Sequence, residues 1–489
     1  MTGRLAAAAL LLTLGLEEAA QEPALEPAEV PAGEPIEEPV PIGIPEVPDP
    51  APPRLPAVAE VQLSGGAPVW VLSRRAVPLV RFEISLTWPG TEAGTHDELA
   101  AALASTVLQA GTKRRSGAEL SAEMDHLGAR WGLGVSTARL WAEVEVPTGD
   151  EAPALDLLVE ALTECAWRRR PTRLAARRWA SWREDIYLDL RRIHRRGLNH
   201  AWFPEGHSSR HTATPAELRH TDASDVRHLV ERLLAEGRLQ VAVVGDITPD
   251  AALALLEPRL AGLGGSLEPA PIAPVPATAR LWLVDRPGFE AATFSVLTPA
   301  PARDDPAWPL ARLLVELTAG GITSRMVADL REQQGLTYSV AGWLESWRGS
   351  GRIQFGAEVP AARTAEALLA MEGHLDRLAA GGVTAAELRA ARNALIVTEG
   401  RRFATTASTT GWLGDVMVRR STLAIEQQRL DALSTATPAD VDALAAGLLA
   451  PEGRVWVITG DRAVIEPQLE AAGRVPDRIV SARILAEER

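Results

Sequence analysis

Apolar and polar positions alternate with two different periods along this chain, and the periods predict strands and helices in mixed order. Period-two patterns over Trp70–Leu72, Val80–Thr87 and Leu140–Pro147 predict strands, and we expect the first two to pair. Apolar stripes at helical spacing predict helices over His96–Ala110, Ala118–Leu127, Ala152–Cys165 and Arg173–Arg192. This order predicts an α+β layer, in which a mostly antiparallel sheet carries helices on one face.

The pattern occurs twice. An amphipathic helix, a Gly turn, a buried β-branched strand and a Gly-Asp turn run from Asp225 to Asp246, and the same order runs from Asp440 to Asp461. A further helix follows each copy, at 251–260 and at 464–472. Because so many positions match at one offset, we infer two homologous halves.

A proline-rich stretch separates these halves. Residues 266–278 contain Pro269, Pro271, Pro274 and Pro276, which predicts a linker. We therefore place an N-terminal domain at 58–265 and a C-terminal domain at 279–489.

The N-terminal residues have the composition of an export signal and a spacer. Arg4 precedes the apolar run Leu5–Leu16, which is too short to span a bilayer but suits a signal peptide over 1–20. Residues 21–57 hold twelve prolines, eight acidic residues and one basic residue, so we expect a disordered tether there. The tether is either a cell-envelope spacer or an inert linker. We expect an exported protein, periplasmic or in the cell envelope, without a transmembrane helix.

Charge and cysteine content exclude several classes of function. The net charge is −14, and residues 1–57 hold ten acidic residues against two arginines. The remaining chain has no basic excess, so we expect no nucleic-acid partner. The single cysteine, Cys165, excludes an internal disulfide and a cysteine-based zinc site, and we expect it to be a buried helix residue.

Motifs in both halves carry a family resemblance. The first half has the turn Gly111-Thr112-Lys113-Arg114-Arg115-Ser116, and in the second half Gly320–Met326 leads into Leu330–Val340. Over residues 58–475 the chain resembles the insulinase/pitrilysin-type zinc peptidases, the inverzincins. The fold that this resemblance implies is two homologous α/β-roll domains, arranged as a clamshell.

The zinc motif of that family is missing. Where the resemblance places His-x-x-Glu-His, the chain reads Ala102-Leu103-Ala104-Ser105-Thr106. Ala102 and Thr106 occupy the ligand positions and Ser105 that of the general base, and none of them suits its role. Glu184 stands near the position of the third ligand, and one carboxylate cannot hold zinc alone. We therefore expect neither a metal site nor a catalytic residue in this chain.

The chain holds one other pair of possible metal ligands. His207 and His211 lie four residues apart, which is half of a metal site, but the flanking prolines indicate a loop and no third ligand is apparent.

The second half keeps the substrate-binding part of the family motif. The resemblance implies that Arg331 and Tyr338 hold a substrate peptide near zinc carried by another domain. An Arg fork suits a peptide carbonyl, and a Tyr hydroxyl can donate to a developing oxyanion. We expect Arg331 to end a helix, Gly335 to break it in the left-handed conformation, and Tyr338 to start a strand. The alternative is that Arg331 pairs with Glu332 and that Tyr338 fills a strand position.

The sequence thus predicts a catalytically silent subunit that contributes Arg331 and Tyr338 to a homologous zinc-bearing peptidase chain, with peptides as substrate. The zinc would be held by that partner. The alternative is a peptide-binding or scaffold pseudopeptidase without any proteolytic role, and a stand-alone metallopeptidase with other ligands is a third interpretation. Trp343 and Trp347 either line a substrate or partner surface or pack in the core.

Overall fold

The computed structural model describes residues 48–88, 95–136, 139–205, 207–210, 213–265, 280–347 and 349–487. Pro50–Arg489 form one compact unit. This unit contains two six-stranded sheets with helices packed on them, as the predicted α+β class requires. The predicted signal peptide, most of the predicted tether and nearly all of the predicted linker lie outside the described residues.

The first sheet has the strand order β1-β2-β6-β3-β5-β4. Its strands are β1 (Ala59–Gln62), β2 (Pro68–Ser73), β3 (Leu79–Thr87), β4 (Arg130–Val135), β5 (Arg139–Pro147) and β6 (Arg238–Gly245). Only β2 and β6 pair in parallel, and the other neighbours are antiparallel.

The second sheet repeats this topology in five of its strands. Its order is β12-β7-β11-β8-β10-β9, so that β7, β11, β8, β10 and β9 take the places of β2, β6, β3, β5 and β4. The strands are β7 (Arg280–Asp285), β8 (Ala291–Ala300), β9 (Ser339–Trp347), β10 (Ser350–Pro360), β11 (Val455–Gly460) and β12 (Arg478–Ser481). The sixth strand differs, because β1 is antiparallel to β2 whereas β12 is parallel to β7.

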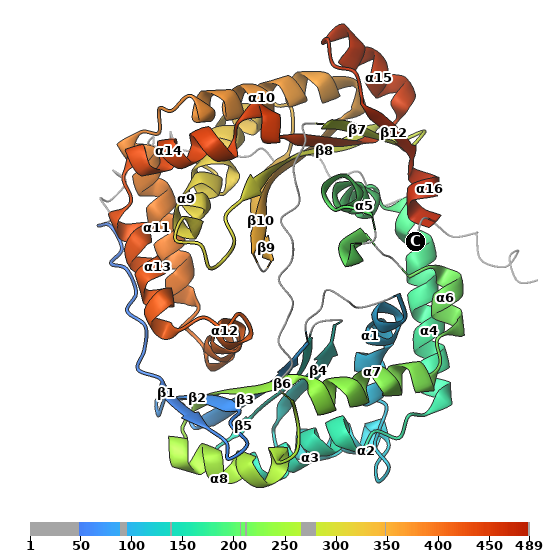
Figure 1. Cartoon of the computed structure of the whole chain (residues 1–489), viewed down its shortest axis with the longest axis vertical. Helices are drawn as coiled ribbons and strands as arrows, with labels where there is room; N and C mark the ends of the chain where they lie inside the picture. Colours follow the sequence, from blue (N-terminus) through green and yellow to red (C-terminus); the bar gives the residue numbers. More distant parts are fainter. Residues whose placement is uncertain are drawn as a thin grey trace, which may run out of the picture. The chain divides into compact units, whose positions relative to one another are not determined.

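Helices connect the strands in both halves (Figure 1). Before residue 266 these are α1 (Thr95–Leu108), α2 (Gly117–His126), α3 (Glu151–Thr163), α4 (Arg169–Glu184), α5 (Leu190–Trp202), α6 (Pro215–His220), α7 (Ala223–Glu236) and α8 (Pro249–Leu260). After residue 279 they are α9 (Trp308–Ala319), α10 (Thr364–Ala379), α11 (Ala385–Arg401), α12 (Thr406–Val418), α13 (Leu423–Thr435), α14 (Pro438–Leu448), α15 (Arg462–Ala471) and α16 (Ala482–Glu487).

Part of the sequence repeat is explained by helix capping. Asp225 is the third residue of α7, and its carboxylate accepts from the backbone N–H of the N-cap residue Asp222, which caps Asp225 in return. Asp440 and the N-cap residue Thr437 form the same capping box at α14. Each box satisfies N–H groups that a helix start leaves unpaired, so the two acidic residues recur for the same physical reason.

One predicted pairing is wrong. We expected Trp70–Leu72 and Val80–Thr87 to be neighbours, but β6 lies between β2 and β3, parallel to the first and antiparallel to the second. β6 follows β3 by about 150 residues, and the hydrophobic pattern of β2 and β3 holds no information on so distant an insertion.

The predicted helix Arg173–Arg192 is also wrong, because the chain changes direction inside it. Helix α4 ends at Glu184, a single 3-10 turn spans Asp185–Leu188, and α5 starts at Leu190. Asp189 has an extended backbone, and its side chain accepts from the N–H groups of Arg191 and Arg192 as an N-cap. An acidic side chain that satisfies these groups favours a new helix start at this point.

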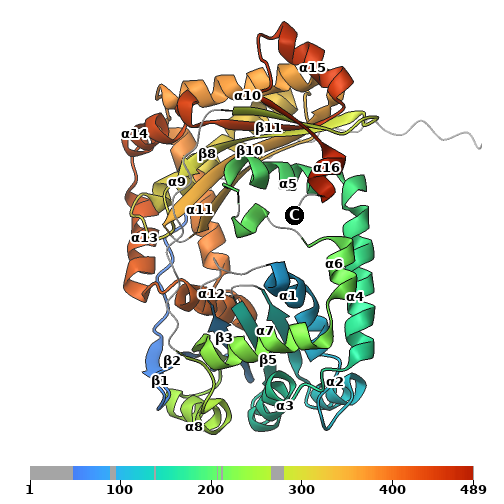
Figure 2. The same cartoon turned by 45° about the vertical axis from the view of Figure 1, so that its right-hand side comes forward.

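The break in that helix allows the two halves to exchange a helix (Figures 1 and 2). Helices α1, α2, α3, α4, α7 and α8 of the first half pack on one face of the first sheet. Its other face, with Trp70 and Val244, is covered by Trp412 and Val416 of α12 from the second half. Conversely, α5 from the first half covers β8 and β11 of the second sheet. The exchange is reciprocal, and the central strands of each sheet, β6 in the first and β11 in the second, are buried on both faces.

The packed unit begins before residue 58. Leu55 lies in the predicted tether, yet its N–H donates to Gln427 Oε1 at 3.0 Å and its side chain packs against Trp412 and Leu430.

Candidate functional site

Arg331 lies in a π-helical turn, Val327–Gln333, that leads into strand β9. The wider turn is closed by a hydrogen bond from Leu336 N–H to the Leu330 carbonyl at 2.8 Å, and both leucine side chains are fully buried. Gly335 has φ +55°, the left-handed conformation that the sequence predicted for it. Single π-helical turns are uncommon and concentrate at functional sites.

The turn brings Arg331 and Tyr338 together. The Arg331 guanidinium carbon lies 5.0 Å from the centre of the Tyr338 ring, within cation–π range. Arg331 also pairs with Glu332 at 3.1 Å, as the alternative interpretation expected. Tyr338 does not fill a packed strand position, because it precedes β9 and is 84% exposed. A large aromatic side chain held this far into solvent beside an arginine is available to a ligand.

A buried histidine of the neighbouring helix α10 holds the same turn in place. His374 of α10 lies 2.6 Å from Asp329 Oδ2, and Gln334 donates to Asp329 Oδ1 at 2.8 Å. Burial lowers the pKa of His374, and the hydrogen bond with Asp329 offsets this only in part. His374 is therefore neutral near pH 7, and it holds the residue two positions before Arg331 without adding charge to the site.

The zinc-helix positions lie on α1, and their surroundings do not suit a metal. Ala102 packs against a small apolar cluster that includes Leu99 and Ala180 of α4. Ser105 accepts a hydrogen bond from Val135 N–H at 3.2 Å, which ties α1 to β4, and Thr106 is exposed. The alanine and the two hydroxyl groups do not fit zinc, which prefers imidazole, carboxylate or thiolate ligands.

The remaining candidate ligands are dispersed. Glu184 is the exposed last residue of α4 and forms an ion pair with Arg219 of α6. His207 stacks on Phe203, with ring centres 4.2 Å apart, and His211 lies outside the described residues. Over the described part of the chain, no three His, Cys, Asp or Glu side chains are grouped closely enough to hold a metal ion.

The turn at residues 111–116 that carried part of the resemblance has a structural role. Thr112 is fully buried and donates to Glu160, which also pairs with Arg115. The Thr112 hydroxyl accepts from the backbone of Arg114 and Arg115 at 3.1 and 3.0 Å. The backbone bridge from Thr112 to the buried Cys165 joins this turn to the end of α3.

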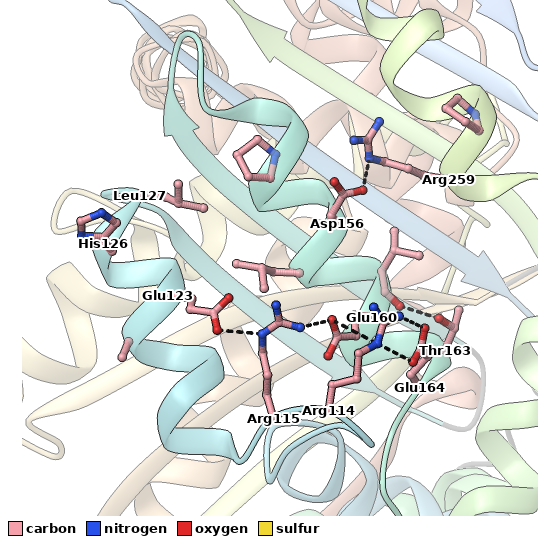
Figure 3. A pocket seen from close by; sticks show the side chains of 15 residues that line it. Arg114, Arg115, Glu123, His126, Leu127, Asp156, Glu160, Thr163, Glu164 and Arg259 are labelled. Carbon is pink, nitrogen blue, oxygen red and sulfur yellow. Dashed lines mark hydrogen bonds and ion pairs between the residues drawn. The ribbon is translucent and has the colours of Figure 1, made fainter.

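Beside that turn lies an open cavity of about 800 Å³ between α2, α3 and α8 (Figure 3). Figure 3 shows its charged side chains paired across the opening, with Arg115 between Glu123 and Glu160, and Arg259 on Asp156. Because each arginine of this cavity is already paired with a carboxylate, we assign the cavity to the packing of the first half and not to the site.

Two buried polar groups lie between the halves and were not expected from the sequence. His194 of α5 is held at 2.9 Å by both Thr459 and Ser295 of the second sheet, and burial lowers its pKa to about 3. Glu83 of β3 lies under α12, and burial raises its pKa to about 7 although Arg139 opposes the shift. On β3, Glu83 shares the polar side of a period-two pattern with Arg81 and Ser85, so the pattern gave no sign that Glu83 is buried.

Two repeated α+β halves, a zinc-type helix without ligands and an exposed Arg–Tyr pair define a peptidase-like protein. Comparison with known proteins agrees with this class. Residues 221–395 match the family model described as the Peptidase M16 inactive domain. Two curated mycobacterial relatives, uncharacterized zinc proteases of Mycobacterium bovis and Mycobacterium tuberculosis, are each 29% identical over 167 residues, 32% of this chain. That alignment spans only 37% of each relative's length.

Solved structures show the same fold. A peptidase M16 inactive domain from Pseudomonas fluorescens matches with a TM-score of 0.75 and 18% identity, over 83% of this chain and 98% of that chain. The periplasmic protease PqqL from Escherichia coli matches with a TM-score of 0.71 and 15% identity, over 85% of this chain and 46% of that chain. The similarity to the insulinase/pitrilysin-type (M16) peptidases that the motifs indicated is confirmed over residues 221–395, and the solved structures show that the fold is shared.

None of the helices in the described part of the chain combines the length and the apolar character that a bilayer crossing requires.

Proposed function

We propose that this chain is a catalytically silent subunit that lends Arg331 and Tyr338 to a peptide bound by a homologous, zinc-bearing chain. The observation that carries the proposal is the Arg331–Tyr338 pair, stacked at 5.0 Å and presented to solvent at the start of an edge strand. The residues at the zinc positions of α1 support the second part, because Ala102 and Thr106 do not fit the metal.

The geometry suits a peptide backbone. The Arg331 side chain is 40% exposed, so part of its guanidinium fork stays free to donate to a carbonyl oxygen. The stacked ring orients the Tyr338 hydroxyl without burying it, so the hydroxyl can donate to the same group as negative charge develops there. A silent subunit of this kind would bind the substrate, and its partner would catalyse the cleavage.

We also propose that the protein is exported and acts in the periplasm or cell envelope. The apolar run Leu5–Leu16 and the Pro/Glu-rich residues after it support this placement. The structural relative PqqL is itself described as periplasmic.

The test is to recover the partner and measure cleavage. The tagged chain is purified from its native host, and bound proteins are identified by mass spectrometry. We expect a homologous chain with an intact His-x-x-Glu-His motif, and peptide cleavage only when both chains are present. If the complex with such a partner cleaves nothing, the peptide-binding pseudopeptidase is the better interpretation.

The chain provides its own matched control for the tyrosine. Its other tyrosine, Tyr187, also stacks under an arginine, with Arg286 at 4.0 Å. Tyr338→Phe and Tyr187→Phe therefore each remove one hydroxyl group from a tyrosine that stacks on an arginine. We expect only Tyr338→Phe to lower the rate of peptide cleavage by the complex. Equal rates for both variants would contradict the proposed role.

A further inference from the structure

A second cavity, of about 800 Å³, lies between the exchanged helix α5 and the second sheet. Figures 1 and 2 show α5 lying along the second sheet, where it contacts β8 and β11. The sheet contributes alternate residues of β9 and β10, which the register places side by side: Ser339 opposite Glu358, Trp343 opposite Gln354, and Glu345 opposite Arg352. The cavity begins one residue after Tyr338.

Most charges in this cavity are neutralised by a partner. Arg191 pairs with Glu358 at 3.0 Å. Arg352, whose side chain is only 4% exposed, donates to Glu345 at 2.6 Å. His194 adds no charge, because its burial lowers its pKa to about 3.

Arg195 is different. It extends from α5 into the lining and is exposed, and over the described residues it has no hydrogen-bond or ion-pair partner. Since the other charges cancel in pairs, the cavity carries one net positive charge. A carboxylate is the group that would balance this charge and accept the two-pronged donation of a guanidinium.

The neighbouring strand offers the means to hold a peptide. β9 is the last strand of its sheet and pairs with β10 alone among the described strands. It contains no proline or lysine, and Trp343 on it is 47% exposed. Its one charged residue, Glu345, is paired with Arg352 of β10, so this charge does not oppose pairing with another strand. A peptide that pairs with this edge places every second side chain on the cavity face.

The chain's own acidic segment is a poor occupant. Residues 21–57 hold twelve prolines, and a proline removes the N–H that strand pairing needs. An external peptide therefore suits the edge better.

We propose that the cavity between α5 and β9 is a subsite for an acidic side chain of an extended peptide, recognised by Arg195 while the peptide backbone pairs with β9. This inference rests on the proposed function, because it takes the peptide that meets Arg331 and Tyr338 as its ligand. It adds a substrate preference to that role, namely Asp or Glu a few residues from the segment held by the Arg–Tyr pair.

The test measures peptide binding to the full chain by fluorescence anisotropy and needs no cleavage. A labelled, C-terminally amidated peptide with a single Glu is compared with its Gln and Lys twins. We expect the Glu peptide to bind about fivefold more tightly than the Gln peptide, the upper range for one partly exposed ion pair. Arg195→Glu should abolish that preference and favour the Lys peptide.

Controls separate the possible outcomes. Arg178→Glu reverses an exposed arginine of α4 outside the cavity and should leave the preference unchanged. A Glu peptide N-methylated at alternate residues, which cannot pair with β9, should bind weakly. A further control is the Gln peptide with a free C-terminal carboxylate in place of the amide. If it binds as tightly as the amidated Glu peptide, the assignment of the cavity to a side chain is overturned.

Two failures can be told apart. If no peptide binds the wild-type chain or its complex, the proposed function fails and the subsite with it. If the peptides bind but Glu and Gln are equivalent, or Arg195→Glu keeps the Glu preference, only the subsite is overturned. Competition by a synthetic peptide of residues 21–47 that matches the Glu peptide would instead assign the cavity to the chain's own acidic segment.

Discussion

Substitution of Glu83 by glutamine should make the protein more resistant to unfolding at alkaline pH. Glu83 lies on β3 beneath α12, so close that a Cβ at Gly414 would stand 2.1 Å from its carboxylate. Burial is the largest cause that raises its pKa from 4.5 to about 7, with Asp415 and Glu143 adding to the rise and Arg139 opposing it. The native state therefore prefers this carboxyl group protonated.

The sign and size follow from that shift. A group whose pKa is raised on folding contributes its full stability below the unfolded value near 4.5, and this contribution is lost as the pH rises through about 7. At 1.36 kcal/mol per pKa unit, the loss is about 3 kcal/mol. Glu83→Gln keeps the neutral shape at every pH. The free energy of unfolding of the variant, relative to that of the wild type, should therefore rise by about 3 kcal/mol from acid to alkaline conditions.

Urea unfolding of both proteins, followed by circular dichroism at about pH 5 and about pH 8, measures this difference. The reasoning would be refuted if the stability of the variant relative to the wild type is the same at both pH values, or lower at the higher pH. It would mean that the ionised carboxylate paired with Arg139 stabilises the contact between β3 and α12.

Other predictions follow from the same structure. His194→Leu should lower stability by about 2–5 kcal/mol, seen as an earlier thermal transition, because the Thr459 and Ser295 hydroxyls lose a buried partner. In the cleaving complex, Tyr338→Phe should lower kcat by roughly 10²–10³, the usual effect of one oxyanion donor. Arg331→Ala should mainly raise KM, since its contact exists before the reaction, and unchanged rates in both variants would make these residues structural. Metal analysis of the purified chain should find no stoichiometric zinc, and N-terminal sequencing of the native protein should start after about residue 20, the end of a typical signal peptide.

Most of the elements that local signals in the sequence predicted lie within a few residues of the observed ones. The strand predicted at Val80–Thr87 is β3, Leu79–Thr87, and the helix predicted at Ala118–Leu127 is α2, Gly117–His126. These elements are set by periodicity and by caps such as the Ser116 box, which act over one or two turns.

Long-range relations were not accessible in the same way. The pattern of Arg173–Arg192 is helical throughout, and only the capping ability of Asp189 distinguishes the break. Helix α5 covers the second sheet by packing on apolar residues more than 80 positions away in the sequence, such as Val284 and Val457. Within the candidate site, a family motif indicated Arg331 and Tyr338, whereas Arg195 follows no motif and stands out only once its neighbours are seen to be paired.

The reciprocal exchange of α5 and α12 has a consequence for synthesis of the protein. The first sheet is complete when residue 245 has left the ribosome, but the face with Trp70 and Val244 waits for α12, which ends at Val418. At 5–20 residues per second the interval is roughly 10–35 s. During that time an apolar sheet face is open to water and to other nascent chains. Each half thus covers an apolar sheet face of the other. Two fragments made by separating the halves between residues 265 and 280 should therefore be soluble only when they are produced together.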